Sequence, residues 1–162
     1  MIWQPNPFAL LALFGAVISL YLVTIAWRRR STPGARPFIA MVLAITWWCT
    51  LNAIQLSSVN AAAQLLLADL QYISVTLLPV CWLLFAWAYT GREAWVTRRN
   101  IWLLLIFPAI ALIIIVTNPW HHLMWTYVPS TLDWNGHFYL LKLETGPNFW
   151  GIVIYSYSLI MA

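Results

Sequence analysis

The stretch PFIAMVLAITWWCTLNAIQLSSVNAAAQLLLA, residues 37–68, contains no Asp, Glu, Lys or Arg. Two further stretches, 70–91 and 100–132, are also free of charged side chains. The hydrocarbon layer of a bilayer is about 30 Å thick, and an α-helix needs about 20 apolar residues to cross it. Uncharged stretches of this length therefore predict a chain that crosses a membrane several times, and they argue against a water-soluble domain.

The composition indicates the same class of protein. Hydrophobic residues make up 63% of the chain and charged residues 7%, whereas a soluble domain is about 25% charged. The 12 Trp residues suit a membrane protein, because amphipathic rings favour the headgroup layer. The net charge of +4 does not indicate nucleic-acid binding, because the basic residues lie in short loops between apolar segments and form no stripe. The expected partner is the lipid bilayer.

Five apolar segments are expected to form helices, because backbone polar groups in lipid must be hydrogen-bonded within their own segment. These segments are approximately residues 8–27, 38–56, 65–89, 101–117 and 149–162. A transmembrane β-barrel would instead show alternating apolar and polar residues, and that pattern is absent. The last segment would rise only about 21 Å as a helix, which does not cross the bilayer. We therefore expect residues 1–162 to be a single transmembrane domain, truncated within its fifth helix and without a soluble domain.

The basic residues predict the orientation of the chain. Seven of the eight lie in two loops, 28–36 and 92–99, and only Lys142 lies on the other side. Because cytoplasmic loops of membrane proteins carry an excess of Lys and Arg, these two loops are expected in the cytoplasm. The interpretation is a multi-pass protein of the plasma (inner) membrane with an extracytoplasmic N-terminus.

The long outer loop, residues 118–148, is expected to be structured. Residues 123–128 and 137–143 are strand-like, and Asn135-Gly136 between them is a typical two-residue hairpin turn. The predicted fold is thus an all-α integral membrane protein, a transmembrane helix bundle of about five spans. A small extracytoplasmic β-hairpin is expected between the fourth and fifth helices.

Polar residues in the outer halves of the helices form the candidate site. Asn52 and Gln55 share a face of the second helix, and Asp69 and Tyr72 share a face of the third. One hypothesis is a pocket for a small, unidentified ligand, with Asn118 and His122 at its rim. The alternative is hydrogen bonding between helices, at about 0.6–2 kcal/mol per bond. The sequence leaves both interpretations open, although an ionisable group near membrane depth favours function.

Two prolines lie inside predicted helices, Pro79 in the third and Pro108 in the fourth. Each removes a backbone hydrogen bond and is able to kink its helix. A hinge that passes movement along the helix is one interpretation. Tolerated irregularity is the favoured one, because neighbouring helices in membranes commonly accommodate proline.

No catalytic or cofactor-binding motif is present, so no catalytic residue, cofactor or metal site is predicted. The three histidines, His121, His122 and His137, all lie in the outer loop. No Cys or paired carboxylate completes a metal-ligand set with them, and adjacent histidines rarely bind one ion. An interfacial polar loop is the expected role of these residues.

Several short sequences resemble one known family. They are LQYI (70–73), LPVCWLLFAWAYTG (78–91), TNPWHHLMW (117–125) and TGPNFW (145–150). In this order they resemble the third helix, the exit of the fourth and the start of the fifth in the N-terminal seven-transmembrane sensor module of bacterial histidine kinases. The resemblance extends over essentially the whole chain, as the first five of seven helices. The chain departs from it at Gln71, where many relatives carry an acidic residue before the tyrosine.

The resemblance implies a signal-input module of a bacterial two-component system. Such a module passes an extracytoplasmic or membrane signal to a cytoplasmic output domain, usually a histidine kinase that works as a homodimer. On that reading the chain itself is not an enzyme. The alternatives are the sensor module of a diguanylate cyclase, a fragment of a multi-span transporter, which would need a binding site at the membrane midplane, and a membrane enzyme, which would need convergent catalytic groups.

Overall fold

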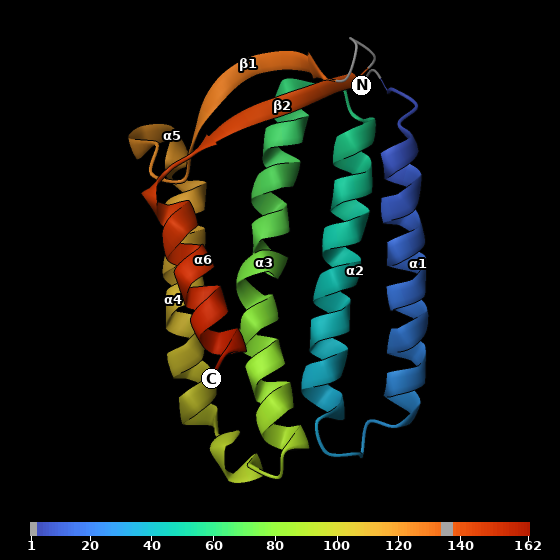
Figure 1. Cartoon of the computed structure of the whole chain (residues 1–162), viewed down its shortest axis with the longest axis vertical. Coiled ribbons are helices and arrows are strands. Elements are labelled where there is room, and N and C mark those ends of the chain that lie inside the picture. Colours follow the sequence, from blue (N-terminus) through green and yellow to red (C-terminus); the bar gives the residue numbers. More distant parts are fainter. Residues whose placement is uncertain (1–2, 134–137) are drawn as a thin grey trace.

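The computed structural model describes residues 3–133 and 138–162 and is mainly helical. Its elements are α1 (Pro7–Arg28), α2 (Ala35–Ser57), α3 (Ala61–Tyr89), the 3-10 helix η1 (Glu93–Trp95), α4 (Arg98–Val116), α5 (Asn118–His121), β1 (Trp125–Asp133), β2 (Phe138–Thr145) and α6 (Pro147–Ile160). Helices α1, α2 and α3 stand side by side, α4 and α6 pack on the other side of α3, and the strands lie across one end of the bundle (Figure 1).

Four of the described helices, α1 to α4, are long and apolar enough to cross a membrane. They confirm the first four predicted segments as helices, with ends that differ from the predicted ones by only a few residues. The fifth segment is also helical, but α6 has 14 residues, fewer than the roughly 20 that a full crossing needs.

Polar side chains determine where three of these helices begin. Asn6, Asn60 and Thr97 each precede a helix, and the side chain of each accepts a hydrogen bond from a backbone N–H of the first turn. Such caps satisfy donors that have no partner within the helix. The cap at Asn60 explains why α3 begins four residues before the predicted start: Ala61 to Gln64 complete the first turn.

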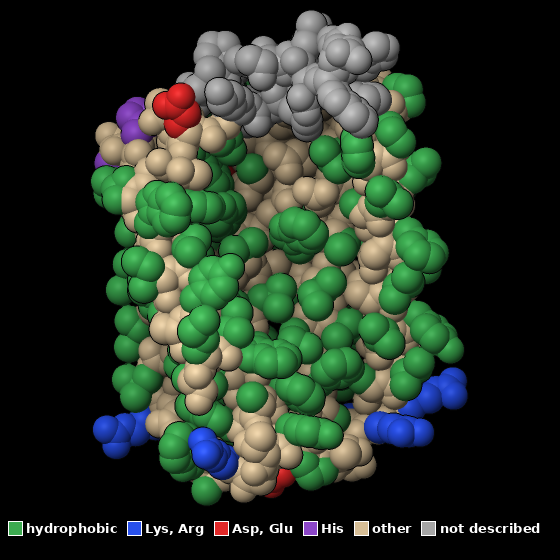
Figure 2. Space-filling model, viewed as in Figure 1, with side chains coloured by type: hydrophobic (Ala, Val, Ile, Leu, Met, Phe, Trp, Pro, Cys, Tyr) green, Lys and Arg blue, Asp and Glu red, His purple; other side chains and the backbone are tan. Residues whose placement is uncertain are grey.

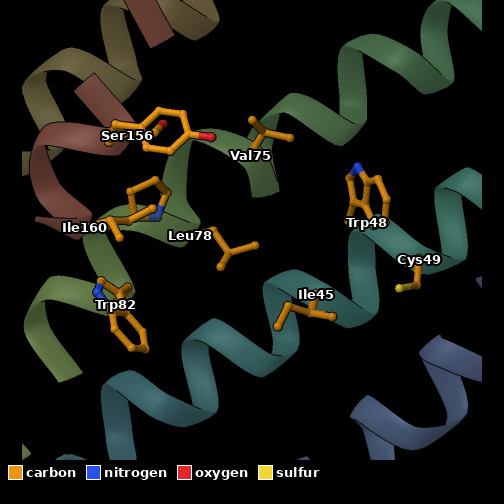
Figure 3. Close-up of a pocket in the computed structure, with 10 residues that line it drawn as sticks. Ile45, Trp48, Cys49, Val75, Leu78, Trp82, Ser156 and Ile160 are labelled. Carbon is orange, nitrogen blue, oxygen red and sulfur yellow. The ribbon is translucent and has the colours of Figure 1, made fainter. Parts of the chain in front are cut away.

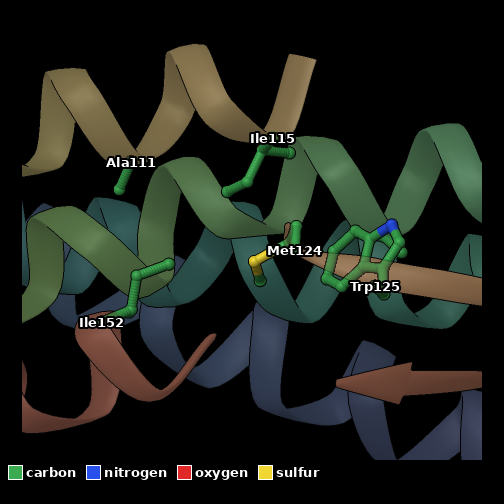
Figure 4. Packing of buried hydrophobic residues seen from close by; sticks show 6 residues of the cluster. Ala111, Ile115, Met124, Trp125 and Ile152 are labelled. Carbon is green, nitrogen blue, oxygen red and sulfur yellow. The ribbon is translucent and has the colours of Figure 1, made fainter. Parts of the chain in front are cut away.

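A hydrophobic core joins α3, α4, α6 and the start of β1. Its buried residues are Ala68, Ala111, Ile115, Met124, Trp125 and Ile152 (Figure 4). Met124 and Trp125 are inserted into this core, with exposed fractions of 0% and 4%. Burial of large apolar side chains stabilises such packing. Trp125, the first residue of β1, therefore fixes this end of the strand against α3 and α4.

The two internal prolines are both buried in the packed helices. Helix α3 continues through Pro79 and α4 continues through Pro108. This continuity is what the favoured interpretation, tolerated irregularity, requires. Hinge motion at Pro79 remains a hypothesis.

Strands β1 and β2 pair antiparallel, from Trp125 opposite Thr145 to Asp133 opposite Phe138, with an irregularity between Val128 and Thr131. The predicted turn, Asn135-Gly136, lies outside the described residues. The pairing extends toward α6, because the N–H of Gly146 donates to the carbonyl of Met124 at 2.7 Å. The strands therefore connect α5, which follows α4, to the beginning of α6.

Candidate functional site

A chain of side-chain amides links α2 to α3 near the end of the bundle that the strands cover. Asn52 Nδ2 donates to Gln71 Oε1 at 3.3 Å, and Gln71 Nε2 donates to Gln55 Oε1 at 2.6 Å. Gln71 Nε2 also donates to the carbonyl of Leu67, and Gln55 Nε2 donates to the carbonyl of Gln64, both at 3.1 Å. These bonds set the rotation and spacing of the two helices at this end.

The spacing of the amides explains the network. Asn52 and Gln55 are three residues apart on α2, and Gln64 and Gln71 are seven apart on α3, so each pair shares a helix face. The helices are joined by a short connection, which brings the two polar faces together. Gln71 is only 5% exposed. An unsatisfied amide would cost several kcal/mol in lipid, so the two polar faces turn toward each other.

A pocket of about 380 Å³ lies beside this network. Its volume falls within the range of about 300–1,000 Å³ that is typical of small-molecule sites. Two amides, three aromatic rings and a residue of β2 form most of its wall. These residues are Gln55, Gln71, Trp48, Tyr72, Trp125 and Thr145. The pocket therefore offers neutral hydrogen-bonding groups beside aromatic faces, and none of the described residues that line it is charged.

One aromatic contact connects the helix wall of the pocket with its strand wall. The rings of Tyr72 on α3 and Trp125 on β1 lie 5.0 Å apart between centroids, at an interplanar angle of 67°. Edge-to-face pairs of this kind contribute about 0.5–1.5 kcal/mol beyond simple burial. A change in the position of β1 would therefore displace a ring that is in direct contact with Tyr72 on α3.

The structure brings together some of the predicted site residues. Gln55 and Tyr72 both line the pocket, and Asn52 is joined to it through Gln71. Asp69, Asn118 and His122 do not line it.

Asp69 lies beside the pocket rather than in its wall. Ala68 and Tyr72, four residues apart on α3, take the lining positions, and Asp69 is rotated by about 100° from Ala68 around the helix. One of its carboxylate oxygens, Oδ1, is buried and has no hydrogen-bond partner among the described residues. A contribution of Asp69 to signalling remains a prediction.

Asn118 organises the backbone where α5 leads into β1. Its Oδ1 accepts hydrogen bonds from the N–H groups of Met124 at 2.8 Å and Trp125 at 3.3 Å. Its Nδ2 donates to the carbonyl of Trp125 at 2.9 Å. The side chain is buried, and its three bonds place Trp125 in the wall of the pocket. Asn118 thus positions the pocket without lining it.

The histidines next to Asn118 also take part in local structure. His121 Nδ1 accepts the N–H of Leu123 at 3.0 Å, and its Nε2 lies 2.9 Å from Thr117 Oγ1. His122 is exposed and ends α5 in the left-handed region, with φ of 53°. His137 lies outside the described residues. Within the described part of the chain, no group of three His, Cys, Asp or Glu side chains could hold a metal ion.

Gln71, Trp48 and Trp125 were not among the predicted site residues. A signal for Gln71 was available, because it lies about two helical turns from Gln64, on the same face of the third helix. Trp48 and Trp125 had no comparable signal. Their place in the pocket depends on the rotation of α2 and on the path of β1, neither of which a sequence pattern determines.

The charged side chains match the membrane-spanning character of the helices. Arginines gather at the end of the molecule that carries the α1–α2 and α3–α4 connections, and hydrophobic side chains cover the surface between the two ends (Figure 2). Large apolar residues on this surface are widely exposed, for example Leu11 at 69% and Ile113 at 63%. Exposed apolar side chains of this kind are energetically favourable in contact with lipid chains and unfavourable in contact with water.

Comparison with protein families finds a match over residues 11–162, to the family described as the N-terminal 7TM region of histidine kinase. Comparison with curated proteins and with solved structures finds no match. The family match extends over nearly the whole chain, and α1 to α4 are the apolar helices that such a region requires. The chain therefore belongs to the family of N-terminal 7TM sensor regions of histidine kinases, and it is a multi-pass membrane protein.

Proposed function

We propose that the chain is the signal-input region of a bacterial histidine kinase, and that the pocket between α2, α3 and β2 receives the signal. One observation carries this proposal. Gln55 and Gln71, which hydrogen-bond to each other across the two helices, both line the pocket. A molecule bound there would touch the contact that sets the spacing of α2 and α3. Its binding energy would then favour one arrangement of the helices over another.

The route from the pocket toward the other end of the bundle is short. Gln71 and Pro79 lie on the same helix, about 12 Å apart along its axis. Proline in a helix interior removes one backbone hydrogen bond, so α3 has a point of lower stiffness below the pocket. A small shift at Gln71 would change the bend at Pro79, and a cytoplasmic output domain would respond to the displaced helix ends.

The proposed topology places the pocket near the outer membrane surface. Seven of the eight basic residues lie at the opposite end of the bundle, and the positive-inside rule assigns that end to the cytoplasm. The N-terminus and the β1–β2 hairpin would then be extracytoplasmic, in the plasma membrane. With α6 as a fifth membrane-embedded segment, the chain would supply the first five of seven helices.

The proposed role is binding and relay, with no catalysis by the chain itself. The described pocket lining consists of amides, aromatic rings, apolar side chains and the hydroxyl of Thr145, and these described residues include no base that could activate that hydroxyl. Phosphoryl transfer would belong to the output domain of the kinase, in a homodimer as the family resemblance implies.

Two substitutions on neighbouring residues of β2 test the proposal in the intact kinase. Thr145 lines the pocket, and Glu144 precedes it, so their side chains point to opposite faces of the strand. Thr145→Phe would fill the pocket, whereas Glu144→Phe would place the same ring outside it. We expect Thr145→Phe to change autophosphorylation in membrane vesicles several-fold and Glu144→Phe to leave it near the wild-type level.

Two further variants distinguish the two interpretations of the polar residues, a ligand pocket and purely structural hydrogen bonding between helices. Asp69→Asn should change autophosphorylation while protein level and melting temperature stay close to wild type, and Gln55→Leu should change it by more than the loss of about 1 kcal/mol from one hydrogen bond explains. If activity instead falls in proportion to stability in both variants, and Thr145→Phe has no effect, the pocket is not the input site.

A further inference from the structure

The pocket that Gln55 and Gln71 line, called the amide pocket below, carries hydrogen-bonding groups that no described residue occupies. It differs in this respect from the larger hollow of about 750 Å³ between α2, α3 and α6 (Figure 3), whose described lining is almost entirely apolar. Nothing in the structure shows what packs against that larger hollow. The free groups of the amide pocket, in contrast, define the chemistry of a ligand.

Two hydrogen-bond donors in the wall of the amide pocket have no partner within the described part of the chain. Trp125 is only 4% exposed, and Asn118 pairs with its backbone N–H and carbonyl, but no described residue accepts a bond from its indole Nε1. Figure 4 shows this nitrogen on the side of the ring that is turned away from Met124. The hydroxyl of Tyr72 has no described partner either.

Both donors border open space. Among the described residues, the fully enclosed side-chain atom without a hydrogen-bond partner is Asp69 Oδ1, so the indole nitrogen of Trp125 and the hydroxyl of Tyr72 are not sealed off. Both residues line the amide pocket. Because a buried indole N–H or phenol O–H usually has a hydrogen-bond partner, these two donors are available to a bound molecule.

Two acceptors complete the set. Oε1 of Gln71 accepts one described hydrogen bond, from Asn52 at 3.3 Å, and Oε1 of Gln55 accepts one, from Gln71. A carbonyl oxygen has two lone pairs, so each oxygen can accept one more bond. The amide nitrogen of Gln71 is already engaged, because it donates to Gln55 and to the carbonyl of Leu67. The pocket therefore offers two donors and two acceptors, beside the hydroxyl of Thr145, which can act as either.

These groups belong to walls that the described part of the chain already builds. Gln71 and Trp125 are 5% and 4% exposed, and the ring of Trp125 packs edge-to-face on that of Tyr72. The matched family region has seven transmembrane segments, and further helices would pack on the outside of these walls. A side chain from such a helix would reach the free groups only by filling the pocket, which a binding measurement on the intact kinase detects.

A carboxamide matches the set of free groups. Its NH2 has two donors for the oxygens of Gln55 and Gln71, and its carbonyl has two lone pairs for the donors of Trp125 and Tyr72. A carboxylate could not donate to the glutamine oxygens, and an amidinium could not accept from the indole or the phenol. The described lining also has no charge to balance either ion, so an ion would lose its hydration and gain little in return.

The rest of the lining favours a flat apolar ring next to the carboxamide. The aromatic rings of Trp48, Tyr72 and Trp125 form much of the wall, together with aliphatic side chains such as Val75 and Leu143. Aromatic rings prefer offset-stacked or edge-to-face neighbours. The volume of about 380 Å³ lies at the lower end of the range for small-molecule sites, so the ligand is compact.

We propose that the amide pocket binds a compact aromatic molecule that carries an uncharged carboxamide group. The NH2 of the ligand donates to Gln55 and Gln71, and its carbonyl accepts from Trp125 and Tyr72. The statement that such a molecule is the signal rests on the proposed function. The binding itself does not.

Saturation-transfer NMR on the intact kinase in phosphatidylcholine nanodiscs tests the binding. The probes are benzamide, benzoate and benzamidinium, which share a ring and a planar head and are neutral, anionic and cationic at about pH 7. Empty nanodiscs correct for partitioning into lipid. We expect saturable binding of benzamide, with an affinity at least about tenfold higher than that of either ion, which corresponds to about 1.4 kcal/mol.

Conservative substitutions test the two donors. Tyr72→Phe removes only the hydroxyl, and Trp125→Phe removes the indole N–H but keeps an aromatic ring. Each should weaken benzamide binding about fivefold, as expected for one lost hydrogen bond. Tyr89→Phe and Trp120→Phe are the matched controls, because these residues are 74% and 85% exposed and do not line the amide pocket. They should bind benzamide like the wild type, and melting temperatures show that each variant is folded.

The variants of β2 locate the probe: Thr145→Phe should abolish benzamide binding and Glu144→Phe should preserve it. Benzamide binding that survives Thr145→Phe would overturn the proposal, as would equal affinities for the three probes. Wild-type affinity in both Tyr72→Phe and Trp125→Phe would also overturn it, and so would the absence of saturable benzamide binding to the intact kinase. Failure of the proposed function would look different: Thr145→Phe would block benzamide binding but leave autophosphorylation unchanged.

Discussion

Gln71 on α3 donates a hydrogen bond to Gln55 on α2 at 2.6 Å, and this bond connects two helices at the wall of a pocket. Gln71 also accepts a bond from Asn52 and donates one to the carbonyl of Leu67. A single buried amide thus holds two side chains of the neighbouring helix. Its position makes the α2–α3 contact sensitive to whatever enters the pocket.

The first prediction concerns the energetic coupling of these two amides. In a double-mutant cycle with Gln55→Leu and Gln71→Leu, each single variant removes the same hydrogen bond from the other amide. The free energy of unfolding in detergent should therefore show a coupling of about 1 kcal/mol. Gln71→Leu combined with Asn100→Ala is the control, because the described bonds of Asn100 are local: its Nδ2 donates to the carbonyl of Trp95, and its backbone N–H donates to Thr97 Oγ1. Additive values in both cycles would mean that the Gln55–Gln71 bond contributes nothing.

The second prediction concerns the junction between β2 and α6. A Cβ at Gly146 would overlap the carbonyl oxygen of Leu123, so Gly146→Ala must displace backbone on one side of the core. We expect a loss of about 1–3 kcal/mol and a lower melting temperature. Gly151→Ala, within α6, would bring its Cβ only to 3.7 Å from Phe107 Cζ, which is ordinary contact. Alanine is the better helix former by about 0.5–1 kcal/mol, so this control should be neutral or stabilising.

The long helices could be predicted because lipid imposes a simple rule on the sequence. Uncharged stretches such as 37–68 and 100–132 must become helices wherever the backbone is in hydrocarbon. The exact helix ends could not be predicted from hydropathy alone. Asn60 and Thr97 start their helices through single side-chain hydrogen bonds, and both residues lie outside the five apolar segments that predicted the helices.

The candidate site could be predicted only in part, because helix rotation and loop path are properties of the packed structure. Spacing placed Asn52 with Gln55 on one face, and the structure joins both to α3. The same argument placed Asp69 with Tyr72, but only Tyr72 lines the pocket. Asn118 was expected at the rim of the pocket. Instead it is buried, and it fixes the path of β1 through three hydrogen bonds.

The third prediction follows from those three bonds. Asn118→Ala removes them and leaves two backbone N–H groups and one carbonyl without their partner, at a cost of about 2–3 kcal/mol. We expect β1 to become more accessible, so limited proteolysis of vesicle-embedded protein should cut residues 125–145 several times faster than in the wild type. Equal cleavage rates in Asn118→Ala, Asn100→Ala and wild type would contradict the role given to Asn118.

The fourth prediction concerns the orientation of the chain, on which the extracytoplasmic position of the pocket depends. Asn60 lies between α2 and α3 at the strand-covered end, and Thr32 lies between α1 and α2 at the arginine-rich end, and both are exposed. With the arginine-rich end in the cytoplasm, a membrane-impermeant maleimide added to intact cells should label Asn60→Cys and not Thr32→Cys. Permeabilised cells should show labelling of both. The chain without an added cysteine gives the background, because Cys49 is buried and Cys81 lies within α3.

Replacing the cap residue Asn60 costs about 1 kcal/mol of helix stability, so the membrane level of each variant is measured alongside the labelling. Ser31→Cys, in the same exposed connection as Thr32, repeats the cytoplasmic test at a position that caps no helix. Labelling of Thr32→Cys and Ser31→Cys in intact cells, with Asn60→Cys protected, would reverse the topology. The amide pocket would then lie on the cytoplasmic side, and an extracytoplasmic signal could not reach it.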